Sequence, residues 1–585
     1  MLGERDASGR TCRFYDLGAQ SFADPDDALL RRAYLYDRRL DLYHSPEGEV
    51  AERTLTEPMA PGDPESRFSD ERFLQALDDF GDSALWTATA GLSAAFRYAA
   101  TGTDADLARL TRFARASASQ FDATGMDGYL GRFHFEGVPA GTPIRNGRAM
   151  VVQRSDAFDI PDGALPQMPD YYREGRPSWL GNPSIDQYSG PLAFYPLAFA
   201  LLQDAPLKAR LARHYACFLK RLRPLHLFNL SQNPALREIL SAYLAAGVWH
   251  PAPDEPDLTQ LDEIWGLYLP RYSAASAGAY PRACPDTLAA DAAPEDVLDA
   301  TAPDFAGHLA RLIVRQDPDV VNADSMDFVF YPSVRASDAV ILLEAALGAY
   351  YLTGDAAFLG WRDQMLVTRA DAREVATTMD ALTLPKACTS YFRGHNVATA
   401  QYVALLLEGD AAAKARGADL WRRKFASLAA EGNLVFSLMG WAALGDAAPD
   451  ALDMLSAFGG SEGHLDDPRR NYDVDDQASP LPGNPTAPPS APDVALCEQG
   501  FDVFGFHVPG PPVSPGQVLA QDPLPPLLRE PRGYLWEGDP FQAVRHFGAD
   551  QGKQEYPGID LAEPYWLARA HRLTADPHIV LAWGP

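Results

Sequence analysis

Residues 338–352 read DAVILLEAALGAYYL, and this stretch decides the fold. It is apolar on nearly every face for about four turns, whereas residues 356–370, after the turn Thr353-Gly354-Asp355, carry charges on one side. A helix that is apolar all round must be surrounded by protein, and an amphipathic helix lies between the core and water. The two segments therefore predict a hairpin of an inner and an outer helix, with the glycine ending the first and the aspartate capping the second.

The same unit recurs along the chain. Inner segments at residues 86–100 and 396–407, and a less regular one at 186–202, lead through short turns to amphipathic outer segments. Repeated hairpins of this kind build either an open solenoid or a closed toroid. The periods are irregular and the insertions long, which favours the toroid. We expect an all-α fold, a toroid of inner and outer helical hairpins that forms one large domain over residues 1–585.

Three long segments lack a helical period and are predicted to be loop insertions, partly β. Residues 121–181 are rich in Gly, Pro and aromatic residues, residues 251–305 in Pro, Ala and Asp, and residues 460–540 in Pro. Loops of this length in a compact fold are usually functional or disordered. Short strands are expected at residues 500–508, and no boundary between domains is evident.

The composition limits the partners. The chain carries 50 Lys and Arg against 79 Asp and Glu, a net charge of −29, which repels phosphate backbones and anionic lipids. Nucleic acid and acidic membranes are therefore poor partners. No apolar run is long enough to cross a membrane and no leader pattern begins the chain. We expect a soluble, acidic protein; a cytoplasmic location and export with a removed leader both stay open, as does the oligomeric state.

The five cysteines lie far apart without a C-x-x-C pair. This spacing excludes a Cys-rich zinc site and a disulfide framework, and it leaves one or two long-range disulfides open. No phosphate-binding loop, dinucleotide fingerprint or nucleophile elbow is present. Nucleotide, NAD and serine-hydrolase chemistry are therefore disfavoured, and no cofactor is expected.

The hairpin pieces YAATGTDADL, YYLTGDAAFLGW and LLLEGDAAAKARGADLW resemble the (α/α)6-toroid proteins. Many of these are carbohydrate-active: glycoside hydrolases, polysaccharide lyases and sugar epimerases. The resemblance covers about a third of the chain and is architectural, since no active-site motif of a particular family is matched. It implies an oligo- or polysaccharide as partner.

In such a toroid the N-termini of the inner helices gather at one end, so polar residues placed there converge on one cleft. One run combines a carboxylate, an amide and a phenol in Asp186, Gln187 and Tyr188, and Trp179 precedes it with a ring suited to sugar stacking. Another run combines Arg393, His395 and Asn396. Asp82, Ser337 and Asp338 also stand at predicted helix starts, where the simpler interpretation is an N-cap, and Glu563 begins the last predicted inner helix.

Three functions are weighed on these residues. Glycoside hydrolysis needs two carboxyl groups, one protonated and one ionised; Asp186 is the first choice, with Asp338 or Glu563 as partner. Elimination by a polysaccharide lyase needs a carboxylate neutraliser and a base, which Arg393, His395, Asn396 and Tyr188 would supply. A non-catalytic glycan-binding or scaffold protein is the third. The net charge favours a neutral glycan and hence hydrolysis. The residues expected to contact substrate are Trp86, His134, Trp179, Gln187, Arg393 and Asn396.

One acidic motif stands apart. Asp473, Asp475 and Asp476 form a D-x-D-D pattern similar to the protonating motif of class II terpene cyclases. In those enzymes a helix follows the motif, whereas here a Pro-rich run follows, so terpene cyclisation is a minor alternative. The same oxygens suit calcium, although the Gly and distal Glu of an EF-hand loop are missing.

Overall fold

The structure is a computed structural model. The residues that it describes are 26–45, 48–55, 74–78, 80–134, 152–154, 178–181, 183–229, 232, 263–269, 283–288, 296–303, 329–330, 336–363, 391–460, 484–489, 491, 494, 501–503, 506–508, 518–526, 529, 534–543, 554–573, 579 and 581. Helices account for 67% of these residues, so the expectation of a mostly helical fold is confirmed.

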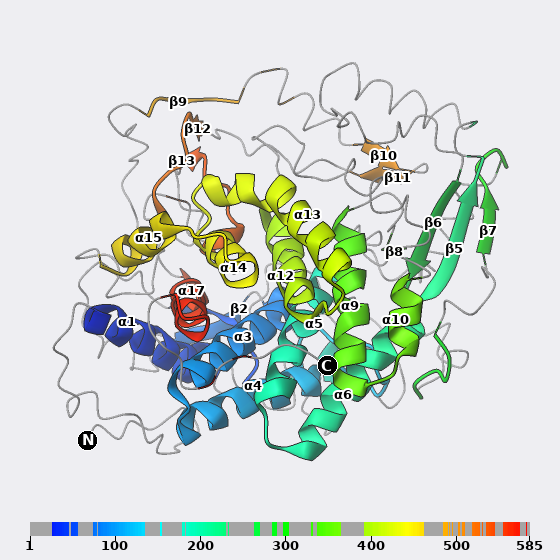
Figure 1. Ribbon diagram of the computed structural model, residues 1–585, viewed down its shortest axis with the longest axis horizontal. Helices are drawn as coiled ribbons and strands as arrows, with labels where there is room; N and C mark the ends of the chain where they lie inside the picture. The colour runs from blue at the N-terminus through cyan, green and yellow to red at the C-terminus, as the bar shows by residue number, and fades with distance from the viewer. Residues whose placement is uncertain are drawn as a thin grey trace.

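Six helices of the described chain are largely buried and form a contact series. Each packs on the next in the order given, and the last packs on the first. They are α3 (Ser83–Thr101), α5 (Ile185–Leu201), α9 (Ala336–Thr353), α12 (Tyr391–Leu407), α14 (Leu434–Leu444) and α17 (Ile559–Ala570). Figure 1 shows them around the middle of the molecule.

A second set of helices packs on the outside of this series. Five of them directly follow a buried helix in the chain, and α1 packs on α17. They are α4 (Asp104–Asp122), α6 (Ala205–Arg221), α10 (Ala357–Arg362), α13 (Ala411–Ala430), α15 (Pro449–Gly460) and α1 (Asp26–Arg39). The four predicted hairpins are confirmed as α3–α4, α5–α6, α9–α10 and α12–α13, whereas α14–α15 and α1 were not predicted.

The turns between paired helices use the expected chemistry. Gly102 adopts a left-handed conformation with φ of 64° and ends α3. The side chains of Thr103 and Asp204 accept hydrogen bonds from the N–H groups of Asp106 and Leu207, which caps α4 and α6. Glycine therefore ends the first helix, and a Thr or Asp side chain caps the second, as the conformational preferences of these residues predict.

Short strands fill parts of the three insertions. A four-stranded sheet has the order β7 (Asp296–Asp299), β5 (Arg223–Phe228), β6 (Glu263–Tyr268) and β8 (Val329–Phe330), with only the β5–β7 pair parallel. Figure 1 shows β5, β6 and β7 at one edge of the molecule. The strands expected at residues 500–508 are confirmed as β10 (Phe501–Val503) and β11 (Phe506–Val508).

The remaining strands form three small sheets. One contains β14 (Gln554–Glu555), β1 (Glu52–Leu55) and β2 (Leu74–Asp78), another contains β13 (Gln542–Ala543), β12 (Val518–Ala520) and β9 (Thr486–Ala487), and the third pairs β3 (Val152–Arg154) with β4 (Ser178–Leu180). The segment before residue 135 also bonds to β4, since the Arg132 N–H donates to the Leu180 carbonyl at 2.9 Å. This pairing fixes the direction in which Arg132 and its neighbours point.

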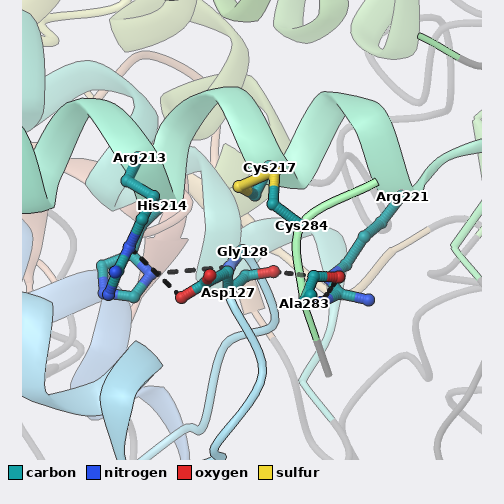
Figure 2. The surroundings of a disulfide bond; sticks show 8 residues. All are labelled: Asp127, Gly128, Arg213, His214, Cys217, Arg221, Ala283 and Cys284. Carbon is teal, nitrogen blue, oxygen red and sulfur yellow. Dashed lines mark hydrogen bonds and ion pairs between the residues drawn. A yellow bond between two sulfur atoms is a disulfide. The ribbon is translucent and has the colours of Figure 1, made fainter. Parts of the chain in front are cut away.

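One long-range disulfide is present, between Cys217 on α6 and Cys284. Figure 2 shows Arg221 beside it, where the guanidinium donates to the carbonyls of Asp127 and Ala283. Gly128 lies against α6 with φ of 78°, and a Cβ there would stand 2.3 Å from the Phe218 nitrogen. Only glycine fits this contact, so the loop that leads from α4 toward Arg132 is pressed onto α6 beside the disulfide.

A buried ion network joins four helices. Asp37 on α1 accepts from Arg97 Nη1 on α3 at 2.8 Å, lies 3.0 Å from Arg109 Nη2 on α4, and accepts from Trp566 Nε1 on α17 at 2.8 Å. Each of these side chains is nearly inaccessible to water. The first and last described helices are thereby bonded to the same carboxylate.

None of the described helices has the length and apolarity needed to traverse a bilayer.

Candidate functional site

The N-termini of α3 and α5 lie side by side. The Gln187 amide on α5 donates to Asp82 Oδ1, just before α3, at 2.8 Å. One turn further on, Gly190 allows a close approach, because a Cβ there would lie 3.0 Å from the Leu85 Cα. These two helix starts therefore converge, as the sequence predicted for the polar residues that they carry.

Five residues around this contact form what we call the Asp82–Asp186 cluster: Asp82, Arg132, Ser184, Asp186 and Gln187. The Arg132 guanidinium donates to the Gly81 carbonyl and to Ser184 Oγ, each at 3.1 Å, and lies 3.7 Å from Asp82 Oδ1. The Arg132 side chain is 7% exposed, whereas that of Asp82 is 35% exposed. A buried cation thus holds a carboxylate that faces water.

The capping interpretation does not hold for Asp82. Although Asp82 and Ser184 occupy the N-cap positions of α3 and α5, neither side chain makes a capping hydrogen bond. The caps of α4 and α6, by contrast, do make them. The two polar side chains bond to Gln187 and Arg132 instead, so they serve the cluster rather than the helix ends.

Asp82 and Asp186 are close to each other. The Gln187 Nε2 atom that donates to Asp82 at 2.8 Å also donates to Asp186 Oδ2 at 3.5 Å. The two carboxylate oxygens are therefore separated by no more than the sum of these distances. The carboxyl groups of glycosidases lie about 5 to 10 Å apart. Asp186 is partly exposed, as Asp82 is.

Next to this pair lies a second group, the Glu563 cluster, formed by Trp86, His395, Tyr534 and Glu563. Trp86 is four residues after Asp82 and so lies on the same side of the helix start. Its ring stacks on Tyr534 with centroids 5.3 Å apart, and the Tyr534 hydroxyl donates to Glu563 Oε2. Burial raises the pKa of Glu563 to about 7, and the side chain is inaccessible to water.

His395 and Asn396 lie at the start of α12 and are also buried. The His395 ring is 4.7 Å from that of Tyr534, and burial lowers the pKa of His395 to about 3. Within the described chain, His395 Nδ1 and Asn396 Oδ1 have no hydrogen-bond partner. His395 is therefore neutral at physiological pH and cannot act as a proton donor in its positive form.

The pairing of Asp186 with Glu563 that the sequence predicted stays a prediction. Among the described residues no contact joins the two, and the Tyr534 hydroxyl donates to Glu563 Oε2. The carboxyl group that shares the Gln187 amide with Asp186 is Asp82. From the sequence, Asp82 was placed among the polar residues at the helix starts with an N-cap as its simpler role, because a single Asp at a helix start has that role in most helices.

Tyr188 and Trp179 are packing residues. The Tyr188 hydroxyl accepts from the Leu130 N–H at 2.9 Å and donates to the Gly128 carbonyl, and its ring stacks on Phe218. The predicted role of Tyr188 as a base is therefore not supported, because its hydroxyl holds a loop. Trp179 is 0% exposed and offers no face to a sugar, contrary to its predicted stacking role.

His134 contacts a carboxyl group that sequence reasoning missed. The His134 N–H donates to Glu49 Oε2 at 2.9 Å, its Nδ1 lies 3.6 Å from Glu49 Oε1, and the Gln120 amide donates to Oε2 at 3.2 Å. Burial raises the pKa of Glu49 to about 8. Glu49 stands in a loop far from any helix start, so no sequence signal marked it.

Asp338 lies in α9 and Arg393 in α12, but their side chains are outside the described part of the structure, as are Asp473, Asp475 and Asp476 entirely. Among the described residues no group of three or more His, Cys, Asp or Glu is arranged to hold a metal ion.

A polar cavity of about 280 Å³ lies away from these clusters, beyond the C-terminus of α12. Arg362, Glu408, Asp410 and Arg416 line it, and Arg362 Nη1 bonds to both Glu408 oxygens, at 3.0 and 2.9 Å. This pairing stabilises the junction of α10 with α12 and leaves the Arg362–Glu408 pair neutral overall.

Comparisons with protein-family models, curated proteins and solved structures found no match to this chain.

Proposed function

We propose that the chain is an (α/α)6 toroid. Two observations support this arrangement. The six buried helices contact one another in a series whose last member, α17, packs on the first, α3. Each buried helix also has an outer partner, including α1 for α17. In an open solenoid the first and last repeats do not touch, so the contact between α17 and α3 favours a closed ring.

We propose further that the protein is a glycoside hydrolase whose active site is the Asp82–Asp186 cluster. The observation that carries this proposal is the pair of partly exposed carboxyl groups that share the Gln187 amide. Hydrolysis of a glycosidic bond needs an ionised carboxylate that attacks the anomeric carbon or activates a water molecule, and Asp186, partly exposed beside a second carboxylate, is suited to that role. Structural N-caps would not require the two side chains to face each other.

The surroundings assign different roles to the two aspartates. Asp82 is held by Gln187 and Arg132, so its orientation is fixed. Asp186 has only the longer bond to Gln187 among its described side-chain contacts, and it is free to approach a water molecule or the sugar. Asp186 is therefore the group that attacks the anomeric carbon or activates a water molecule, and Asp82 positions Gln187 and the substrate. The net charge of −29 favours a neutral glycan over a polyuronate.

A panel of neutral and acidic glycans tests this function. Wild type is expected to release reducing ends without the ultraviolet absorbance of unsaturated uronate. Asp186→Asn is expected to lower kcat by roughly 10² to 10⁴-fold, the usual contribution of a positioned acid or base, and Asp82→Asn to raise KM as well. Asp446→Asn is the matched control, because Asp446 is exposed and, among the described residues, its ion pair is with the exposed Arg422 of the outer helix α13.

The other outcomes are distinct. Product that absorbs in step with the reducing ends identifies a lyase, and it moves the site toward His395 and Asn396. Glycan binding without product identifies a binding protein. Full activity in Asp186→Asn contradicts the assignment of the Asp82–Asp186 cluster.

A further inference from the structure

Hydrolysis of a glycosidic bond needs a carboxyl group that still carries its proton at working pH. Such a group lies in apolar surroundings, whereas its partner is solvated and hydrogen-bonded. Asp82 and Asp186 both face water, and Asp82 also faces the Arg132 cation, so neither has the surroundings of the protonated member. A third carboxyl group is therefore needed beside the cluster.

Among the described residues, three carboxyl groups with little exposure lie at this end of the helices: Glu49, Asp560 and Glu563. Asp560 is 2% exposed and Glu563 is 0% exposed, and Glu563 Oε2 accepts the Tyr534 hydroxyl. The Glu49 side chain is 9% exposed, so one edge reaches the surface while most of it is buried. Of these three carboxyl groups, Glu49 is therefore the one that a substrate can reach.

Glu49 is tied to the Asp82–Asp186 cluster from two directions. His134 donates to it, and Arg132, two residues earlier in the same segment, bonds inside the cluster. The N–H of Val50 donates to Thr87 Oγ1 on α3 at 2.8 Å. Thr87 is five residues after Asp82, which is about 7.5 Å along a helix axis.

The loop that carries Glu49 is held firmly. Gly48 has φ of 106°, a conformation that other residues rarely adopt, and a Cβ there would stand 2.8 Å from Ala116 Cβ on α4. The described groups that face the Glu49 carboxyl are the backbone N–H and ring of His134 and the amide of Gln120. These contacts fix the carboxyl without placing a permanent cation against it.

We propose that Glu49 is the proton donor for glycoside hydrolysis at the Asp82–Asp186 cluster, an inference that rests on the proposed function. The Glu49 carboxyl gives its proton to the glycosidic oxygen while the bond from that oxygen to the anomeric carbon breaks, with its electron pair going to the oxygen. Asp186 takes a proton from water as the water oxygen bonds to the anomeric carbon. One water is consumed, and the proton on Asp186 returns to Glu49 through solvent.

The burial that raises the pKa of Glu49 to about 8 supports this role. At neutral pH the group is protonated in the folded protein, and it loses its proton only as the pH rises through about 8. Activity is therefore expected to fall above pH 8 in the wild type.

The test compares wild type with Glu49→Gln on aryl glycosides of the sugar that the panel identifies. The loss in kcat/KM is expected to reach roughly 10² to 10⁴-fold for phenols that leave poorly. The loss is expected to be less than tenfold for the 2,4-dinitrophenyl glycoside, because its leaving group departs without being protonated. The fall above pH 8 should vanish in the variant. An equal loss for every leaving group, or none, overturns the role of Glu49 and leaves the proposed function standing.

A second measurement does not depend on activity. The infrared carbonyl band of a protonated carboxyl group at neutral pH is expected in the difference spectrum of wild type minus Glu49→Gln, with thermal melting showing that both are folded. Absence of this band overturns the proposal. If wild type hydrolyses no glycan on the panel, the proposed function itself is refuted. If wild type is active but the Glu49 tests fail, only the role of Glu49 is refuted.

Discussion

Glu344 is a carboxyl group buried in the middle of α9, and neither of its oxygens has a hydrogen-bond partner among the described residues. Burial raises its pKa well above the ordinary value of 4.5. Above pH 4.5 the unfolded chain releases this proton and the folded chain keeps it, so stability falls as the pH rises. The loss is about 1.4 kcal/mol per pH unit until the folded pKa is reached.

Glu344→Gln removes this dependence because the amide does not ionise. Relative to wild type, the variant is expected to gain unfolding free energy as the pH rises above 4.5, until the raised pKa of folded Glu344 is reached, while the two differ least near pH 4. Urea denaturation of both proteins across this range measures the difference. A difference that stays constant with pH would show that Glu344 is ionised in the folded state.

At the scale of single residues, the sequence identified only part of the proposed site. Asp186 and Gln187 were named because a carboxylate and an amide together at a helix start exceed what a cap needs. The proposed roles of Glu49, Asp82 and Arg132 were missed because each depends on contacts with distant segments, such as the bond from Arg132 to Ser184. Spacing along a chain carries no information on such contacts.

At the scale of elements, the packing of α3 on α5 depends on glycine. A Cβ at Gly91 would stand 2.5 Å from the Phe194 ring on α5, whereas one at Gly360 in α10 would meet nothing within 4 Å. Gly91→Ala is expected to destabilise by about 1 to 3 kcal/mol through overpacking. Gly360→Ala is expected to stabilise by about 0.5 to 1 kcal/mol, because alanine favours a helix.

Thermal and urea denaturation of the two variants separates these effects, since both replace a helical glycine by alanine. Equal shifts in the two proteins would mean that helix propensity alone decides the outcome. A loss of stability in Gly91→Ala beside a gain in Gly360→Ala would assign the difference to the α3–α5 contact.

The hairpins were predictable because their signals are local. An apolar run, a Gly-Asp turn and an amphipathic run lie within about 35 residues, and propensity, pattern and capping agree. α17 was only partly recognised, since its start was placed at Glu563 whereas the helix begins at Ile559 after Gly558. Pro564 inside this helix obscured its first turn. The pairing of β1 with β14 joins residues some 500 positions apart, which no local pattern predicts.

At the scale of the whole molecule, the Cys217–Cys284 disulfide closes a long loop, since the two cysteines are 67 positions apart in sequence. By the chain-entropy account, its loss is expected to lower the free energy of unfolding by about 4 kcal/mol. Urea denaturation of wild type with and without reductant measures this. The double variant Cys217→Ser, Cys284→Ser should have the free energy of unfolding of the reduced protein, and reductant should not change it. If reductant still lowers the stability of this variant, another cysteine is involved.

The proposed (α/α)6 arrangement was expected from a resemblance and from repeated hairpins. The contacts that favour a closed ring are the packing of α17 on α3 and on α1, together with the bond from Trp566 to Asp37. The sequence does not indicate these contacts, because an Asp in an amphipathic helix and a Trp in an apolar one are common. The proposed closure therefore rests on contacts between segments far apart in the chain.

The contact between Asp37 and Trp566 spans 529 positions. A ribosome adds about 5 to 20 residues each second, so roughly half a minute to two minutes separates the synthesis of these partners. Throughout that interval α17 has not been synthesised, so it does not yet cover Asp37, Arg97 and the adjoining face of α3. During most of its synthesis the nascent protein therefore exposes the apolar face of α3 together with the charges of Asp37 and Arg97. We expect chaperones that bind unfinished chains to bind this surface.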